Sequence, residues 1–195
     1  WGIEMLQTKR RFFGNIVGNV DSVADPASLN SWTAEKFDQA LNWDRIKKLM
    51  DMWGGKVILK GILSPEDAEM AAQVGADAIV VSNHGGRQLD GALSSIRMLP
   101  SIVQAVGDRT EVWLDSGIRS GQDVLKALAL GAKGVMIGRA FVYGLGAMGE
   151  PGVTRALEII QKELDTSMAL CGERRVQDLK RENLLVPNGF FDAYS

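Results

Sequence analysis

The middle of the chain alternates between short apolar runs and longer segments whose apolar residues have helical spacing. The apolar runs at 57–62, 79–81, 111–115 and 134–138 have the length of buried strands. Strands that alternate with helices in this way indicate parallel βα units. Four such units fit part of a (β/α)₈ barrel, and a small open doubly wound sheet is the alternative. No Gly-x-Gly-x-x-Gly follows any of the runs, which weakens a dinucleotide-binding form of that alternative.

Local signals mark the ends of the expected helices. Residues 64–67 combine a capping serine, a proline and two acids, which predicts a helix start, and Gly75 predicts the end of that helix. Pro100 is expected to mark a break in the next helix. Helical spacing also extends over 33–53, and a long amphipathic helix is expected over 152–171.

The same pattern divides one domain of 195 residues into three parts. Residues 1–35 are expected to form a loop or helix segment, 56–172 hold the four βα units, and 173–195 form a tail. Residues 1–20 mix aromatic and aliphatic side chains with a Lys-Arg-Arg run. Such a segment either covers its own domain, which we favour, or lies on a membrane surface.

Composition limits the classes of function. Hydrophobic residues make up 46% of the chain and charged residues 24%, as in an ordinary globular protein, and the net charge of −2 gives no reason to expect nucleic-acid binding. Cys171 is the only cysteine, so an intrachain disulfide is excluded and a reducing, cytoplasmic compartment is indicated. The chain begins at Trp1 in the middle of a polar–apolar pattern, which suggests a longer polypeptide.

The carboxyl ends of the four predicted strands carry most of the candidate chemistry. In both architectures, ligands bind at this edge of a parallel sheet. The residues there are mostly cationic or small: the first strand offers Lys60, the second His84 and Arg87, the third Asp115, Gly117 and Arg119, and the fourth Gly138 and Arg139. The sequence therefore predicts a binding site with positive charge at this edge.

Two kinds of chemistry are indicated within that set. His84, the only histidine, can transfer protons near neutral pH, and Arg87 offers a planar fork for a carboxylate or a phosphate. Gly138 and Arg139 stand where a helix begins, which is a favourable seat for a phosphate, with 116–119 as its second side. Lys60 either stabilises negative charge on a ligand or pairs with an acid such as Asp115. One histidine and no clustered carboxylates give too few ligands for a metal site.

Four motifs resemble those of one known family. Ser82–Asp90, Leu59–Gly61, Asp115–Arg119 and Ile137–Arg139 are similar, in this order, to motifs of the FMN-dependent 2-hydroxy-acid oxidases and dehydrogenases. That family includes glycolate oxidase, L-lactate dehydrogenase and (S)-mandelate dehydrogenase. The resemblance runs over about 1–185, and the Asp-Ser-Gly and Gly-Gly-Arg variants look closer to the lactate and mandelate dehydrogenases.

The resemblance implies a (β/α)₈ barrel of which this chain supplies strands five to eight, with FMN as cofactor. The activity implied is oxidation of an (S)-2-hydroxy acid to the 2-oxo acid. His84 would be the base, Arg87 would bind the substrate carboxylate, and Lys60 would lie near the flavin N1–O2 edge. The other implied cofactor-binding residues are Asp115 at the ribityl chain, Arg119, Gly138 and Arg139 at the phosphate, and Ser82 and Gly117.

The first half of the family's barrel, with strands one to four, has no counterpart in this sequence. We therefore expect a C-terminal half that is inactive alone, with open sheet edges. Another FMN- or phosphate-binding barrel enzyme is the remaining alternative. The expected electron acceptor is oxygen or else a quinone or cytochrome. The resemblance also implies a homo-oligomer, a tetramer when complete, and it allows peripheral membrane contact through residues 1–20 at the inner face of the membrane.

Overall fold

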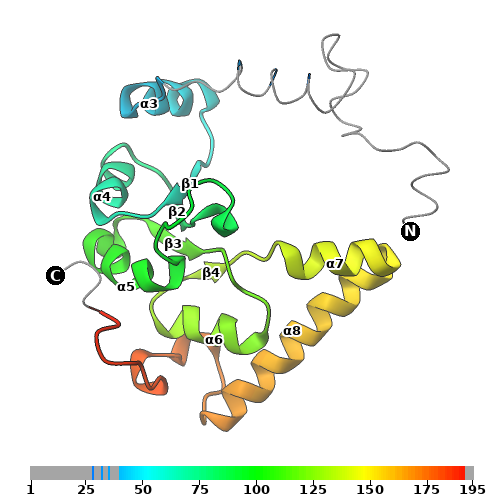
Figure 1. Ribbon diagram of the computed structural model, residues 1–195. Coiled ribbons are helices and arrows are strands. Elements are labelled where there is room, and N and C mark those ends of the chain that lie inside the picture. The colour runs from blue at the N-terminus through cyan, green and yellow to red at the C-terminus, as the bar shows by residue number, and fades with distance from the viewer. Residues whose placement is uncertain (1–27, 29–31, 33–34, 36–39, 192–195) are drawn as a thin grey trace. The chain divides into compact units, whose positions relative to one another are not determined.

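The computed structural model divides the chain into two units, 1–46 and 47–195 (Figure 1). The residues that it describes are the continuous range 40–191 and three single positions before it, Ser28, Trp32 and Glu35. The expected segment over 1–20 therefore lies outside the described residues, and the candidate site belongs to the second unit.

Four parallel strands form one sheet in the order β1-β2-β3-β4. Their bounds are β1 Ile58–Ile62, β2 Ala78–Val81, β3 Glu111–Leu114 and β4 Gly134–Val135. All four predicted strands are confirmed, but the fourth is shorter than the expected 134–138. Leu114 is the last residue of β3, and it pairs with Val135. After Val135, β4 therefore has no further residue of β3 with which to pair.

The strand order decides between the two architectures. Successive strands are neighbours throughout, whereas the order in a doubly wound sheet reverses at a switch point. The sheet therefore has the winding of a β/α barrel, and the doubly wound alternative is wrong. Among the described residues, the outer edges of β1 and β4 have no strand partner.

Helices connect the strands and follow the last one. Their bounds are α3 Trp43–Trp53, α4 Pro65–Gln73, α5 Ser95–Val106, α6 Gly121–Ala129, α7 Arg139–Met148 and α8 Glu150–Leu170. Four 3₁₀ turns complete the described structure: η1 His84–Gly86, η2 Gly107–Arg109, η3 Val176–Asp178 and η4 Arg181–Asn183. None of the helices in the described part of the chain is both long and apolar enough to span a membrane.

The predicted helix start at 64–67 is confirmed, α6 begins with a similar serine cap, and the break expected at Pro100 is wrong. The Ser64 hydroxyl accepts the Asp67 N–H at 3.1 Å, and Ser120 forms a capping box at the start of α6. Pro100 does not break its helix, because α5 continues through it to bury side chains on both sides of the proline. Within the helical spacing over 33–53, the described residues include a helical position at Glu35 and the helix α3 from Trp43.

The apolar core lies between the sheet and the helices that follow β1 and β2. Every residue of β2 is buried, as expected for a central strand of a parallel sheet. The largest fully buried apolar side chains come from β2, α5 and β3: Ile79, Val80, Val81, Met98, Leu99, Ile102, Val106 and Leu114. A smaller cluster of Leu125, Ala129, Met168 and Leu179 joins α6, α8 and the segment after α8.

Close helix contacts fix α7 and α8 against each other. A Cβ on Gly144 of α7 would overlap the carbonyl oxygen of Gly152 of α8, and the reverse is also true. Small residues therefore let these two backbones touch, and this contact supports the segment that begins at Gly138.

We predict that Gly144→Ala destabilises the fold by about 1–3 kcal/mol, because the added methyl group must push α7 away from α8. Gly146→Ala on the same helix is the matched control, since its Cβ meets no atom within 4 Å. That control should be neutral or stabilising by up to about 1 kcal/mol, as alanine is the better helix former. Urea unfolding of both variants measures the difference, and equal effects would contradict the packing argument.

Candidate active site

One cavity of about 520 Å³ lies at the carboxyl ends of the strands. All the predicted site residues except Ser82 line it: Lys60, His84, Arg87, Asp115, Gly117, Arg119, Gly138 and Arg139. Ser82 is buried directly beside them, and its hydroxyl accepts from Lys60 Nζ at 3.1 Å. The structure thus brings together residues from all four strand ends. Its lining carries more positive than negative charge, which favours an anionic ligand.

The Asp115 carboxylate is the centre of the hydrogen-bond network in this cavity. Lys60 Nζ lies 3.1 Å from Asp115 Oδ2, and the Ser116 hydroxyl donates to Oδ1 at 2.7 Å. Burial of the carboxyl group acts to raise its pKa, but hydrogen bonds from Ser82 and Ser116 together with Lys60 outweigh burial. The pKa of Asp115 is therefore lowered from its ordinary value, and the carboxylate form is stabilised.

Of the two roles that the sequence left open for Lys60, the structure shows the pairing with Asp115. Besides its ion pair with Asp115, its Nζ lies 3.3 Å from His84 Nδ1. An ammonium group can only donate, so Nδ1 is the acceptor in this contact. Lys60 therefore places positive charge between the carboxylate and the imidazole, at the floor of the cavity.

His84 lies in a left-handed turn. The φ angles of His84, Gly85 and Gly86 are +58°, +71° and +72°, a conformation that glycine adopts easily and other residues rarely adopt. The Asn83 side-chain oxygen accepts the N–H groups of Gly85 and Gly86 at 3.1 and 3.2 Å. The two glycines noted in the sequence are thus needed for the turn that carries the imidazole out of the sheet.

The predicted anion seat lies at the start of α7. Gly138 is the N-cap residue and has no side chain to cap the helix, so the first N–H groups of α7 are available to an anion. Arg139 Nη2 donates to the Gly85 carbonyl at 2.8 Å, and Arg119 and Arg139 also line one smaller cavity together. A Cβ on Gly117 or Gly138 would meet no atom within 4 Å, so the space beside them is open.

The structure gives hydrogen-bonding roles at the site to three polar residues for which the sequence predicted no such bonds. Ser116 bonds both Asp115 and the Gly85 N–H, and Asn83 closes the left-handed turn. Ser95, which is 1% exposed, donates to the Asp115 carbonyl at 2.6 Å. The sequence carried a signal for Asn83, since an Asn side chain commonly bonds the backbone N–H two residues on, here that of Gly85. Ser116 belongs to the stretch 116–119 predicted beside the anion seat, but the sequence carried no signal for its bond to Gly85.

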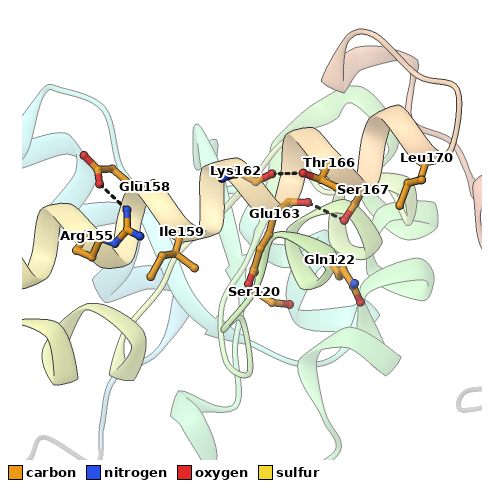
Figure 2. A pocket seen from close by; sticks show the side chains of 10 residues that line it. All are labelled: Ser120, Gln122, Arg155, Glu158, Ile159, Lys162, Glu163, Thr166, Ser167 and Leu170. Carbon is orange, nitrogen blue, oxygen red and sulfur yellow. Dashed lines mark hydrogen bonds and ion pairs between the residues drawn. The ribbon is translucent and has the colours of Figure 1, made fainter.

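A second groove, of about 470 Å³, runs between α6 and α8 (Figure 2). Its polar groups bind one another: Arg155 pairs with Glu158 at 3.3 Å, and the Thr166 and Ser167 hydroxyls donate to carbonyls of their own helix. Glu163 accepts the Gly121 N–H at 2.9 Å and so ties α8 to the start of α6. This groove joins two helices and holds none of the predicted site residues.

Fold and cavity together define a β/α-barrel type of protein with a cationic ligand site at its strand ends. The family model of the FMN-dependent dehydrogenases matches residues 4–186 of this chain. The chain therefore belongs to the FMN-dependent dehydrogenase family, which confirms the resemblance drawn from the four motifs.

Individual relatives agree with this assignment. The chain is 48% identical over 179 residues to an L-lactate dehydrogenase of Caulobacter vibrioides, covering 92% of this chain and 46% of that protein. It is 51% identical over 180 residues to an L-lactate dehydrogenase of Actinobacillus pleuropneumoniae, covering 92% of this chain and 47% of that protein. The chain thus spans about half the length of the curated relatives that it matches.

Solved structures show the same relationship. A monotopic membrane protein, (S)-mandelate dehydrogenase, matches with a TM-score of 0.78 and 38% identity over 85% of this chain and 44% of that one. A mandelate oxidase with (S)-4-hydroxymandelic acid matches with a TM-score of 0.75 and 46% identity over 79% of this chain and 43% of that one. The predicted fold class, four βα units of a (β/α)₈ barrel, is thereby confirmed.

The lowered pKa of Asp115 makes a prediction about pH and stability. Ionised Asp115 stabilises the folded protein above the ordinary aspartate range, and this contribution is lost as pH falls through the lowered folded-state pKa. Wild type should therefore be more stable than Asp115→Asn near neutral pH, and the gap should narrow on acidification. Urea unfolding of both proteins from about pH 7 to about pH 3 measures it.

Asp165→Asn is the control for that series, because Asp165 is exposed on α8 and away from the cavity. The free energy of unfolding of Asp165→Asn should match that of wild type at every pH of the series. A gap between wild type and Asp115→Asn that stays constant with pH would show that ionisation of Asp115 does not hold the network together.

Proposed function

We propose that this protein oxidises an (S)-2-hydroxy acid, lactate-like or mandelate-like, to the 2-oxo acid with FMN as its cofactor. The observation that carries the proposal is the single cavity that joins His84, Arg87 and Lys60 to an anion seat. The relatives named L-lactate dehydrogenase and the mandelate oxidase seen with (S)-mandelic acid support the substrate class. A mandelate oxidase structure that contains an FMN adduct supports the cofactor.

The residues of the cavity fit FMN. A phosphate suits the start of α7, where uncapped N–H groups, Gly138 and the guanidinium groups of Arg119 and Arg139 converge. Gly117 leaves open space beside that seat. Asp115 and Ser82 offer polar groups for a hydroxylated chain, and the Lys60 ammonium suits the electron-rich N1–O2 edge. When bound, FMN accepts the two electrons that leave the substrate.

Arg87 and His84 provide the substrate chemistry in this proposal. Both side chains are exposed at the cavity. The Arg87 guanidinium binds the substrate carboxylate with two parallel hydrogen bonds, which orients the 2-carbon. His84 then removes a proton from the substrate as general base. Two routes are compatible with these roles: His84 takes the proton from the 2-carbon, or it takes the proton from the substrate hydroxyl group.

The electron acceptor and the assembly state follow from the family resemblance and are proposed with it. Oxygen as acceptor would make the protein an oxidase, and a quinone or cytochrome would make it a dehydrogenase. A homo-oligomer, a tetramer in the complete barrel, is proposed on the same ground. Admitting air to the reduced protein distinguishes the acceptors, since only an oxidase should regain the oxidised flavin spectrum rapidly.

Because this half is expected to be inactive alone, the activity is tested on the complete barrel. The measurement is the visible spectrum of the purified protein under anaerobic conditions, before and after addition of L-lactate or (S)-mandelate. We expect a flavin spectrum that bleaches on addition of substrate. His84→Ala should keep the bound flavin and slow its reduction by about 10²- to 10⁴-fold, because the base is lost and the phosphate seat is not.

Two results would count against the proposal. A colourless protein that does not take up added FMN would exclude the cofactor, and bleaching of His84→Ala at the wild-type rate would remove His84 from the base role. Thr166→Ala is a suitable control variant, because Thr166 bonds only its own helix at the second groove and should leave reduction unchanged.

We also propose peripheral membrane association through residues 1–20, at the cytoplasmic face. The support is the basic and aromatic content of that segment and the structural match to a monotopic membrane protein. The protein should co-sediment with anionic liposomes and should not with zwitterionic ones. Replacing Lys9, Arg10 and Arg11 with Gln should weaken binding by about 1 kcal/mol for each residue. Absence of co-sedimentation by the wild-type protein would contradict the proposal.

A further inference from the structure

Ser116 has a backbone conformation that costs free energy. Its φ is +72°, and within the described residues His84 is the only other non-glycine with a positive φ. Glycine would occupy this position without strain, because a Cβ crowds the backbone in the left-handed region. Strain of this kind persists only where surrounding interactions hold the residue in place. The hydrogen bonds of the Ser116 hydroxyl therefore indicate what holds the residue in this conformation.

The Ser116 hydroxyl makes two hydrogen bonds that use both of its capacities. It donates to Asp115 Oδ1 at 2.7 Å and accepts the Gly85 N–H at 2.9 Å. Ser82 does the same one residue earlier, since its hydroxyl bonds the Asp115 carboxyl and accepts the His84 N–H at 3.0 Å. Two serines thus connect successive N–H groups of the left-handed turn to one carboxylate.

Ser82 attaches the His84 N–H to the end of β2, but the remaining bonds of the turn do not attach Gly85 to β3. Asn83 bonds the N–H groups of Gly85 and Gly86, but these bonds lie within the turn and do not attach it to β3. Arg139 reaches the Gly85 carbonyl from an exposed side chain that also belongs to the anion seat. Ser116 is half-buried and stands directly after β3, so its bond fixes the turn to the sheet itself.

We propose that Ser116 is a positioning residue: its hydroxyl holds the left-handed turn, and with it the His84 imidazole, against the Asp115 carboxylate. The catalytic meaning of this role rests on the proposed function, whereas the positioning itself is a property of the folded chain. Ser116→Gly is the informative change, because it removes the hydroxyl and relieves the strain at the same time.

Nuclear magnetic resonance of the full chain tests the proposal without substrate or flavin. His84 is the only histidine, so the protein has a single imidazole signal that reports on this turn alone. In Ser116→Gly we expect that signal to shift and the Gly85 amide to exchange with solvent about fivefold faster or more, since one of its acceptors is lost. The thermal midpoint should stay the same or rise, because glycine fits φ +72°.

Ser94→Ala is the matched control. Ser94 is exposed at the start of α5 and its side chain makes no capping hydrogen bond, so the Gly85 amide and the imidazole signal should not change. Ser116→Asn is the second variant. Asparagine tolerates a positive φ and again offers a donor and an acceptor, so it should restore part of the Gly85 protection.

Each outcome decides the question. An unchanged imidazole signal and unchanged Gly85 exchange in Ser116→Gly would overturn the proposal. So would faster exchange that is equal at the buried β2 amides and at Gly85, because Ser116 would then support stability in general. Anaerobic flavin reduction is measured separately: if the wild-type protein does not reduce flavin, the proposed function fails while the exchange result stands.

Discussion

The ionised carboxylate of Asp115 is the interaction on which the rest of the candidate site depends. Its partners come from the ends of three neighbouring strands: Lys60 from β1, Ser82 from β2 and Ser116 directly after β3. A largely buried charge is tolerated here because a counter-charge and two hydroxyl donors replace its water. The backbone ladders fix the spacing of the strands, and these side-chain contacts fix the positions of the polar groups at their ends.

A second lysine–aspartate pair, at the opposite end of the sheet, shows that the effect of such a pair depends on burial. There, Asp77 pairs with Lys56 and accepts the Val57 N–H at 2.8 Å, and the Lys56 hydrogen bond is the main cause of the lowered Asp77 pKa. The Lys56 side chain is 87% exposed, so that pair contributes little to stability. The same two residue types at the carboxyl ends lie in a cavity with bonds across strands. Of the two pairs, Lys60–Asp115 is therefore the one that positions groups of the candidate site.

Much of this architecture was predictable because it depends on local signals. Capping by Ser64 and Ser120 involves residues three positions apart, and parallel strands bring their carboxyl ends to one edge whatever lies between them. The continuation of α5 through Pro100 was not predictable, because buried side chains on both sides of the proline decide it. The bond from the Gly85 N–H to Ser116 was missed for a similar reason, because the two residues are 31 positions apart in the chain.

Gly85 shows why the base and the anion seat form one structure. Its N–H is held by Ser116 beside β3, and its carbonyl accepts from Arg139 at the start of α7. A Cβ at this position would lie 2.9 Å from Arg139 Nη2, the end of a flexible side chain that can shift, so the φ of +71° is the main reason for glycine here. The guanidinium has five N–H groups, so Arg139 can bind an anion and retain Gly85 at once. An anion at the α7 start is therefore held by the same side chain that touches the turn bearing His84.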